Sequence, residues 1–320
     1  MHIAQVRDWS KGPEYITVPD APAPTENQAQ LRVLAAGLHQ VVRSRASGQH
    51  YSASRGGGSG AGLPHNVGID CVARDVATGE LYYCMNMQQP GFGSFAEVIT
   101  VDKSALYPLP ASIDAESFAA SVNPAMSSWL ALKHRAFNLP ENFTVLILGV
   151  TSASGRLAVR VAKSLGAGKV VGVARKAVEI DGLDEFILQK DIVTETDFSQ
   201  LSSHVDVVLD YVYGDLAMHL LSTIKVAPGK SVQYVMIGGL SGQFDVPFPT
   251  AAMRSKDITV RGSGPGAISF SVILEEMKEL VNAMTGWKLL DTVRGVPLKD
   301  IETVWKDKEL QKKHRLVFIP

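Results

Sequence analysis

The chain has few of the residues that hold small secreted domains or metal modules together. Its 320 residues include only two cysteines, Cys71 and Cys84, and neither belongs to a Cys-x-x-Cys pair. A disulfide scaffold or a zinc ribbon needs more cysteines at closer spacing. We therefore expect two buried, reduced thiols, since free cysteine packs as a small apolar side chain.

Two further features are missing, an excess of one charge and a long apolar run. The 31 Lys and Arg residues nearly balance the 32 Asp and Glu residues, for a net charge of −1. A chain without a basic excess lacks the electrostatic footprint of a nucleic-acid-binding protein. No run is apolar enough to cross a membrane, and residues 1–8 carry charge where a signal peptide would be apolar. We expect a cytoplasmic protein with no membrane or nucleic-acid partner.

The first third of the chain is typical of a β-rich domain. At this length about two domains are expected, and 46% of the residues are hydrophobic, as in a globular protein. A glycine-rich run at 52–62 predicts a flexible loop or a lid over a pocket. Short apolar or alternating runs between Pro and Gly predict strands at 3–6, 31–36, 67–73 and 96–101.

After Pro140 the pattern changes to alternating strands and helices, which predicts a parallel sheet with right-handed crossovers. Strands are expected at 145–149, 169–174, 205–209, 231–237 and, as an edge strand, 258–260, with helices at 126–137, 155–165 and 215–226. From Ile268 we expect a long amphipathic helix, a shorter one and a closing strand at 316–319. That strand could complete the first domain, so the α/β unit would be an insertion. The basic cluster at 306–315 is interpreted as a solvated helix face.

The strongest chemical signal is a glycine loop between the strand at 145–149 and the following helix. Glycines in such a turn let a pyrophosphate approach the backbone, and the helix N-terminus favours its charge. The spacing is GxxSxxG, which differs from GxGxxG, and a purely structural turn is the alternative. The absence of a following Lys-Ser/Thr argues against a P-loop. The candidate cofactor contacts in this loop are Gly149, Thr151, Ser152, Ala153, Ser154 and Gly155.

The residues after the second strand of the α/β unit favour NADP(H) over NAD(H). An NAD site places Asp or Glu about twenty residues beyond the loop, where it binds the ribose hydroxyls. Arg175 stands at that distance from Gly155, and Lys176 follows it. Two cations would attract the 2′-phosphate of NADP(H). Solvated loop charges are the alternative.

Other candidate cofactor contacts follow from the position of the strand ends. Ligands bind outside the carboxyl ends of parallel strands. Tyr211 and Tyr213 follow the strand at 205–209, and we expect one of them to face the cofactor. Gly238 and Gly239 follow the next strand, and Ser263 follows the edge strand as a weaker candidate.

Four segments together resemble the medium-chain dehydrogenase/reductases, most closely their zinc-independent quinone-oxidoreductase and enoyl-reductase branch. They are GSFAEVITVD (93–102), NPAMSSWLAL (123–132), VLILGVTSASGRLAVRVAKSLGAGKVVGVAR (145–175) and HVDVVLDYVYGD (204–215). The resemblance implies an α/β fold in which a GroES-like β-rich domain, 1–120 plus 267–320, surrounds an inserted Rossmann domain with a doubly wound parallel sheet, 121–266. It also implies a homodimer formed through an edge strand.

The chain departs from the zinc-dependent members of this family at each ligand position. Their first Cys falls at His39, after Ala35-Ala36-Gly37, and their Gly-His-Glu is Gly68-Ile69-Asp70 here. Their second Cys falls near Asn123. Only His39 and Asp70 could be ligands, whereas a catalytic zinc needs three. No metal is therefore expected.

The resemblance also suggests catalytic residues and further cofactor contacts. Tyr51 stands where related quinone reductases carry a tyrosine in the substrate pocket, and its phenol could donate to the substrate oxygen. His39 could contact the nicotinamide ribose or the substrate and deliver a proton; a structural histidine is the alternative. Asn123 and Ser127 fall where family members touch the nicotinamide, whereas Trp129 is expected in the core.

Without a Lewis acid to polarise an alcohol, an already polarised acceptor is favoured. The leading hypothesis is an NADPH-dependent oxidoreductase that transfers hydride to a hydrophobic conjugated carbonyl or quinone. Two alternatives remain at this point: a carbonyl-to-alcohol reductase, and a non-catalytic NADPH-binding protein of the crystallin or sensor kind.

Overall fold

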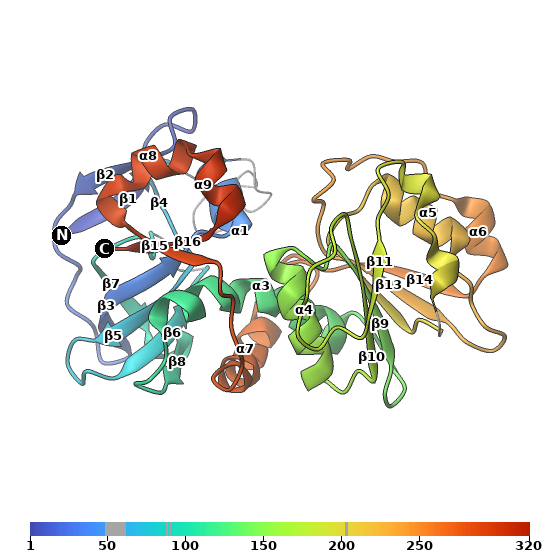
Figure 1. Ribbon diagram of the computed structural model, residues 1–320. Helices are drawn as coiled ribbons and strands as arrows, with labels where there is room; N and C mark the ends of the chain where they lie inside the picture. Colours follow the sequence, from blue (N-terminus) through green and yellow to red (C-terminus); the bar gives the residue numbers. More distant parts are fainter. Residues whose placement is uncertain (49–61, 88, 90, 202–203) are drawn as a thin grey trace. The chain divides into compact units, whose positions relative to one another are not determined.

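The computed structural model describes residues 1–48, 62–87, 89, 91–201 and 204–320. Contacts divide the chain into two units (Figure 1), Met1–Asn123 with Met277–Pro320, and Pro124–Glu276. The divisions fall inside two helices, α3 (Ala115–His134) and α7 (Phe270–Met284). The second unit is thus an insertion in the first, while the domain boundaries expected from the sequence stay a prediction.

The first unit contains a mostly antiparallel sheet and a small three-stranded one. The large sheet has the order β15-β16-β3-β5-β6-β8, with β7 also paired to β3, and the small one the order β2-β1-β4. Its strands are β1 (His2–Val6), β2 (Pro13–Thr17), β3 (Gln28–Gly37), β4 (His65–Asn66), β5 (Asp70–Asp75), β6 (Leu81–Met85), β7 (Val98–Asp102), β8 (Leu106–Leu109), β15 (Val293–Pro297) and β16 (Arg315–Ile319). Its shorter helices are α1 (Gln40–Ala46), α8 (Ile301–Lys306) and α9 (Lys308–Lys313).

The closing strand β16 completes this unit, as the sequence predicts. It pairs antiparallel to β3, with Val317 opposite Gly37, and parallel to β15. Phe318 is fully buried, and its ring centroid lies 5.0 Å from that of Phe95. Burying a phenylalanine contributes about 1.5–3 kcal/mol, so β16 supplies both hydrogen bonds and core to the unit.

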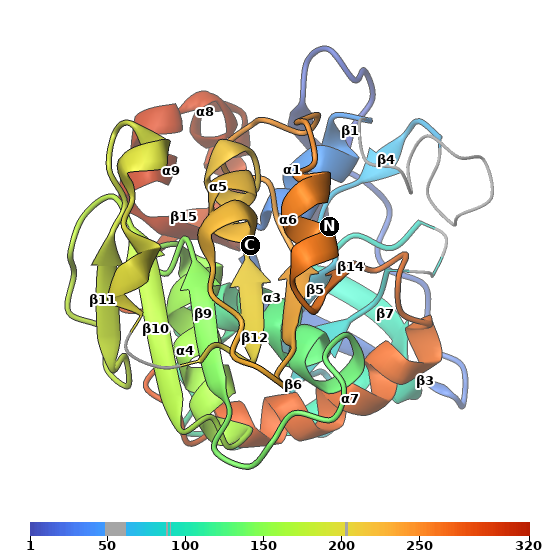
Figure 2. The ribbon, with the colours of Figure 1, turned by 90° about the vertical axis from the view of Figure 1, so that its right-hand side faces the viewer.

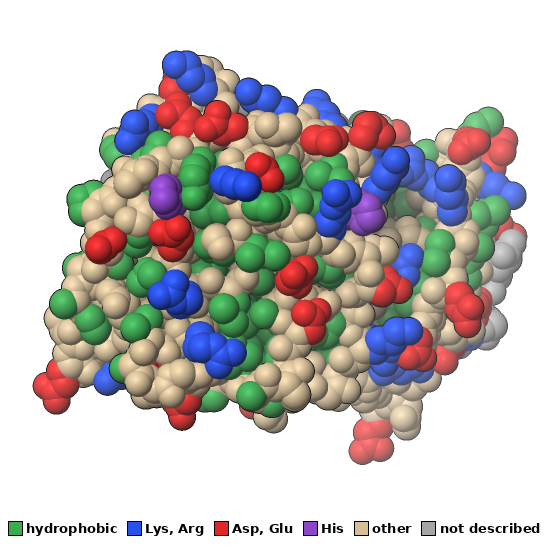
Figure 3. All heavy atoms as spheres, turned by 60° about the vertical axis from the view of Figure 1, so that its left-hand side comes forward, with side chains coloured by type: hydrophobic (Ala, Val, Ile, Leu, Met, Phe, Trp, Pro, Cys, Tyr) green, Lys and Arg blue, Asp and Glu red, His purple; other side chains and the backbone are tan. Residues whose placement is uncertain are grey.

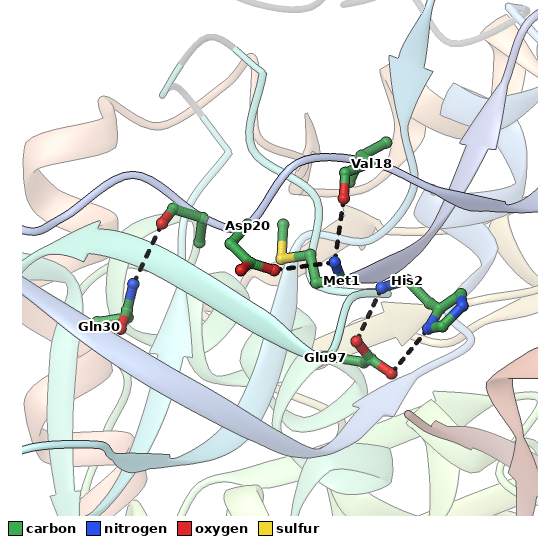
Figure 4. Close-up of polar contacts among 7 residues, drawn as sticks. Met1, His2, Val18, Asp20, Gln30 and Glu97 are labelled. Carbon is green, nitrogen blue, oxygen red and sulfur yellow. Dashed lines mark hydrogen bonds and ion pairs between the residues drawn. The ribbon is translucent and has the colours of Figure 1, made fainter.

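The first strand is fastened at its start by polar contacts (Figure 4). The amino group of Met1 donates to the carbonyl of Val18 at 3.0 Å and to Asp20 at 3.0 Å. The backbone N–H of His2 donates to the Glu97 carboxylate at 2.8 Å. These contacts secure β1 against its neighbours.

The second unit is a six-stranded parallel sheet with the order β11-β10-β9-β12-β13-β14 (Figure 2). Figure 1 shows helix α4 on one face of this sheet and α5 and α6 on the other, as in a doubly wound fold. The strands are β9 (Thr144–Leu148), β10 (Lys169–Ala174), β11 (Glu185–Leu188), β12 (Val207–Asp210), β13 (Val232–Met236) and β14 (Ile258–Gly262). The helices are α4 (Ala153–Ser164), α5 (Asp215–Thr223) and α6 (Thr250–Ser255).

After Thr144, strand β9 is apolar because both of its faces are covered. Leu146 and Leu148 belong to the cluster that includes Leu216 and Leu220 of α5. Val145 and Ile147 are also fully buried, and alternation places them on the opposite face. A continuous apolar run is the signature of such a central parallel strand.

The prediction from the sequence was wrong about the start of α3. The helix begins at Ala115 instead of near Met126, and it contains Pro124. A proline inside a helix costs about 3 kcal/mol. Phe118 and Val122, in the preceding turns, are fully buried, and their burial offsets that cost.

Helices of the described residues are all too short or too polar to cross a membrane. Figure 3 shows acidic and basic side chains interspersed with apolar ones on one face, in keeping with the net charge of −1.

Candidate active site

The glycine loop forms a tight turn between β9 and α4. Gly149 has φ = +83°, in the region that favours glycine. A side chain there would begin 2.9 Å from Cγ2 of Val212. The N–H groups of Gly149 and Val150 both donate to the carbonyl of Val173, at 2.9 and 3.2 Å. The loop is therefore fastened to the end of β10.

Gly155 allows the first turn of α4 to approach this loop. A Cβ atom on Gly155 would lie 2.3 Å from the carbonyl oxygen of Gly149. Ser152 caps the helix, since its Oγ accepts a hydrogen bond from the N–H of Gly155 at 3.0 Å. Thr151, Ala153 and Ser154 are partly exposed around the helix N-terminus. A turn of this shape fits a pyrophosphate, because backbone N–H groups and the helix dipole favour an anion there.

Arg175 and Lys176 follow β10 directly, beside the glycine loop. Both are exposed, and among the described residues neither forms an ion pair or a hydrogen bond. On the neighbouring helix, by contrast, Lys163 is paired with Asp184 at 2.6 Å. Arg160 is likewise paired with Asp181. Two exposed cations beside an anion-binding loop fit a further phosphate.

The two tyrosines after β12 differ in environment. Tyr211 is buried, and its hydroxyl lies 3.2 Å from Oγ of Ser127. Burial raises the pKa of Tyr211 to about 12, so its phenol stays protonated. Tyr213 is partly exposed, and no described residue hydrogen-bonds its hydroxyl. Of the two, Tyr213 has the side chain that is free to meet a ligand.

Ser127, one of the expected cofactor contacts, also bonds within the unit. Its hydroxyl donates to the carbonyl of Pro124 at 2.7 Å. With Tyr211 on its other side, only part of its hydrogen-bonding capacity remains for a ligand.

Asp210 organises the loop after β12, a role that the sequence did not reveal. The carboxylate is fully buried. It accepts from the N–H of Val212 at 2.7 Å and of Tyr213 at 2.9 Å, and from the hydroxyl of Tyr234. Burial raises the pKa of Asp210, although these hydrogen bonds oppose the rise. Tyr213 is held at φ = +59°, an uncommon conformation for a residue other than glycine.

The loop after β13 meets the loop after β12. A side chain on Gly238 would lie 2.9 Å from the carbonyl oxygen of Tyr211, and one on Gly239 would strike the ring of Phe244. The N–H of Ser263 donates to Met236 at 2.8 Å. The candidates Gly149, Gly155, Arg175, Tyr213, Gly238 and Ser263 therefore gather around the carboxyl edge of one sheet.

His39 is a buried member of a polar chain in the first unit. Its Nε2 lies 2.9 Å from one oxygen of Asp70, and its Nδ1 accepts from the guanidinium of Arg315. The hydroxyl of Tyr83 donates to Asp70 at 2.7 Å. His39, Asp70 and Tyr83 are all fully buried. This environment is that of the structural alternative, and a contact of His39 with substrate stays a prediction.

The electrostatics of this cluster fix the tautomer of His39. Burial lowers the pKa of His39; Asp70 opposes the shift and Arg315 adds to it. The ring is therefore neutral, with its proton on Nε2 facing Asp70. Both ring nitrogens are engaged, so no lone pair remains for a metal. Within the described residues, no three His, Cys, Asp or Glu side chains gather as a metal site.

The remaining candidates are placed as follows. Tyr51 and most of the glycine-rich run lie outside the described residues. Asn123 lies in α3, in the first unit, and is partly exposed. Trp129 is buried, as expected, and donates to Glu276 at 2.7 Å. Both cysteines are free and buried, which confirms that prediction.

Two cavities lie away from these residues. One, of about 570 Å³, is lined by residues 138–143 and 165–166, which precede β9 and β10. It therefore opens at the amino edge of the sheet, where parallel α/β sheets do not bind cofactors. The other, of about 510 Å³, lies in the first unit between β1 and β7.

The role of Asp210 was not predicted from the sequence. Its signal is weak, namely that an acidic residue at the end of an apolar strand must find partners.

Comparison with known proteins places the chain in a family, although no family model matches it. It is 33% identical to the probable NADPH-dependent quinone reductase tdiC of Emericella nidulans, over 100% of both chains. It is 24% identical to the quinone oxidoreductase of Sus scrofa, over 83% of this chain and 80% of that one. The structure matches the quinone oxidoreductase of Thermus thermophilus with a TM-score of 0.79 at 22% identity, over 100% of both chains. The full-length identity and the shared fold show that the chain belongs to the quinone oxidoreductases of the medium-chain dehydrogenase/reductase family.

Proposed function

We propose that this protein reduces quinones with NADPH. The observation that carries the proposal is the glycine loop at the carboxyl edge of the sheet, with two exposed cations beside it. The loop fits the pyrophosphate of a dinucleotide, and Arg175 and Lys176 fit a 2′-phosphate. The relative from Emericella nidulans is named for the same cofactor and substrate class.

The residues of the second unit would bind and orient the cofactor. Thr151, Ser152, Ala153 and Ser154 would hold the pyrophosphate at the start of α4. Tyr213, Gly238, Gly239, Ser127 and Ser263 would border the path toward the reacting end, and Asn123 is a further proposed contact. Bound NADPH would supply a hydride, so that the quinone gains two electrons and one hydrogen and, with one proton from the protein or water, becomes a hydroquinone.

Tyr51 is the proposed proton donor, and His39 the second candidate. A neutral phenol can donate to a quinone oxygen as negative charge develops there. His39 could serve only if its contacts to Asp70 and Arg315 opened, because both ring nitrogens are engaged.

The test is to incubate the purified protein with NADPH and, in parallel, a quinone, an enone and a simple ketone. Hydroquinone formation with NADPH oxidation supports the proposal. A saturated ketone from the enone would point to enoyl reduction, and an alcohol to carbonyl reduction. Stabilisation by NADPH without oxidation of any acceptor would indicate a non-catalytic binding protein.

A homodimer formed through β14 is also proposed. β14 is the edge strand of its sheet, and Val260 on it is 38% exposed. An edge strand presents free N–H and C=O groups to a second copy. Light scattering of the purified protein tests this, and a monomer at all concentrations contradicts it. We also propose that the protein is cytoplasmic. Because its positive and negative charges nearly balance, we propose that it binds no nucleic acid.

A further inference from the structure

The loop between β13 and α6 exposes several large apolar side chains. Leu240 is 62% exposed, Phe244 70% and Phe248 44%. Isolated exposed apolar residues are common, but several on one short loop mark a surface that binds something apolar.

This exposure does not come from a loosely held loop. The N–H of Leu240 donates to the carbonyl of Tyr211, and that of Ser241 to Val212, both at 3.0 Å. The side chain of Gln243 accepts from the N–H of Asp215 at 2.9 Å and donates to its carboxylate at 2.8 Å. The backbone that carries Leu240 and Phe244 is therefore fastened to the loop after β12.

Both side chains lie beside the proposed cofactor site. A Cβ atom on Gly149 would lie 3.8 Å from Cδ1 of Leu240. The ring of Phe244 rests against Gly239, since a Cβ atom there would lie 2.6 Å from the ring. Leu240 is thus next to the glycine loop, and Phe244 packs against Gly239 in the same loop after β13.

The strand order tells which end of the cofactor this is. Arg175 follows β10, on one side of β9, whereas Leu240 and Phe244 follow β13, on the other side. With the 2′-phosphate at β10 and the pyrophosphate at the glycine loop, the reacting end points toward β12 and β13.

We propose that Leu240 and Phe244 form an apolar wall that receives a ring substituent of the quinone. The wall would make the enzyme selective for aryl-substituted quinones over unsubstituted ones. Rings packed edge-on or offset against phenylalanine gain free energy beyond the burial of their area. This inference rests on the proposed quinone reduction and names the substrate class within it.

The test compares 1,4-benzoquinone with 2-phenyl-1,4-benzoquinone, which differ by one apolar ring. In Phe244→Ala we expect kcat/KM for the phenyl compound to fall about tenfold, with that for benzoquinone within about twofold of wild type. The matched control is Phe137→Ala, because Phe137 is also exposed (47%) and one face of its ring packs against the guanidinium of Arg261, 4.1 Å from the ring centroid. The control should leave the ratio between the two substrates unchanged.

A binding measurement separates this inference from the proposed function. Calorimetry of 2-phenyl-1,4-benzoquinone with the NADP+-loaded protein should give a Kd about tenfold higher in Phe244→Ala. An unchanged Kd and an unchanged kcat/KM ratio overturn the inference. An equal loss of NADPH affinity in Phe244→Ala would assign the wall to the cofactor site. A changed elution volume of this variant in size-exclusion chromatography would assign the wall to an interface between copies. Either result overturns the inference. A wild type that is inactive with every quinone would overturn the proposed function. The calorimetric Kd values would still test whether Leu240 and Phe244 form the apolar wall.

Discussion

At the scale of single residues, His39 lies between an anion and a cation. Asp70 faces one ring nitrogen and Arg315 the other, so a neutral imidazole joins two opposite charges. Burial lowers the pKa of Arg315 to about 10, with Asp70 opposing the shift, which leaves the guanidinium charged at neutral pH.

This arrangement predicts an acid-sensitive stability that depends on His39. The folded ring has a pKa below the ordinary 6.5. Below about pH 6.5 the unfolded chain therefore binds a proton that the folded chain does not. As the pH is lowered below about 6.5, the free energy of unfolding should therefore decrease, by at most about 1.4 kcal/mol per pH unit. Urea unfolding at a series of pH values measures this slope.

The comparison variant is His39→Gln, whose amide can still bond Asp70 and Arg315 but does not titrate. Its stability should fall less steeply below about pH 6.5 than that of the wild type. Equal slopes would contradict the lowered pKa. The same variant tests proton delivery, because an unchanged pH–rate profile would rule out His39 as the donor.

The sequence predicted only part of this cluster. It singled out His39 and Asp70, but it placed Arg315 in a solvated basic helix face, which is wrong. Arg315 begins β16 and bonds His39 across 276 residues of sequence. Such a pairing depends on how the sheet closes, and a single sequence holds no local signal for it.

At the scale of elements, the loops after β12 and β13 depend on Asp210. One buried carboxylate satisfies two backbone N–H groups and the hydroxyl of Tyr234. The loop after β13 then bonds the carbonyls of Tyr211 and Val212. The conformation of the loop after β12 therefore helps to set the conformation of the loop after β13.

Asp210→Ala should loosen both loops. It leaves the partly buried N–H groups of Val212 and Tyr213 and the hydroxyl of buried Tyr234 without this partner, at a cost of up to about 1–3 kcal/mol each. We expect a lower free energy of unfolding by urea and a weaker NADPH affinity by calorimetry. The control is Asp206→Ala at the other end of the strand, where Asp206 accepts from the N–H of Thr144 at 2.8 Å. It should lose stability but keep its NADPH affinity, and an equal loss of affinity in both variants would contradict a local role for Asp210.

Sequence periodicity predicted best the elements that bury an apolar face. β9, α4 and β10 follow the expected rhythm, because each is apolar on the face that it buries. The edge strand β14 was also predicted, although its residues are partly or fully exposed. β11 was not predicted, since Ile187 is its one buried residue and Leu188 is exposed. The start of α3 was missed because Pro124 is unfavourable inside a helix. Burial of the helix in the folded protein offsets that cost, and local sequence does not reveal this burial.

At the scale of the whole molecule, cofactor binding should stabilise the folded chain. NADPH at about one hundred times its Kd would add about 2.7 kcal/mol. We expect NADPH to raise Tm more than NADH at equal concentration, because Arg175 and Lys176 favour the 2′-phosphate. Thermal unfolding with each cofactor measures the difference.

The matched variants are Arg175→Glu and Lys230→Glu. Both residues are exposed, but Lys230 precedes β13, at the amino edge of the sheet. Arg175→Glu should remove the advantage of NADPH over NADH, whereas Lys230→Glu should keep it. If NADH stabilises the wild type as well as NADPH does, the assignment of the cofactor is wrong.

The insertion of one unit into the other has a consequence for synthesis of the chain. The second unit is contiguous, so all of its strands have emerged from the ribosome once residue 276 and the stretch that fills the exit tunnel have been made. The first unit must then wait with Ala36 and Gly37, at the end of β3, unpaired on one side, because β7 covers only Gln28–Arg32 on that side and β16 comes last. During translation the unit made first is completed second, and its open strand edge is the segment of the nascent chain most in need of protection by a chaperone.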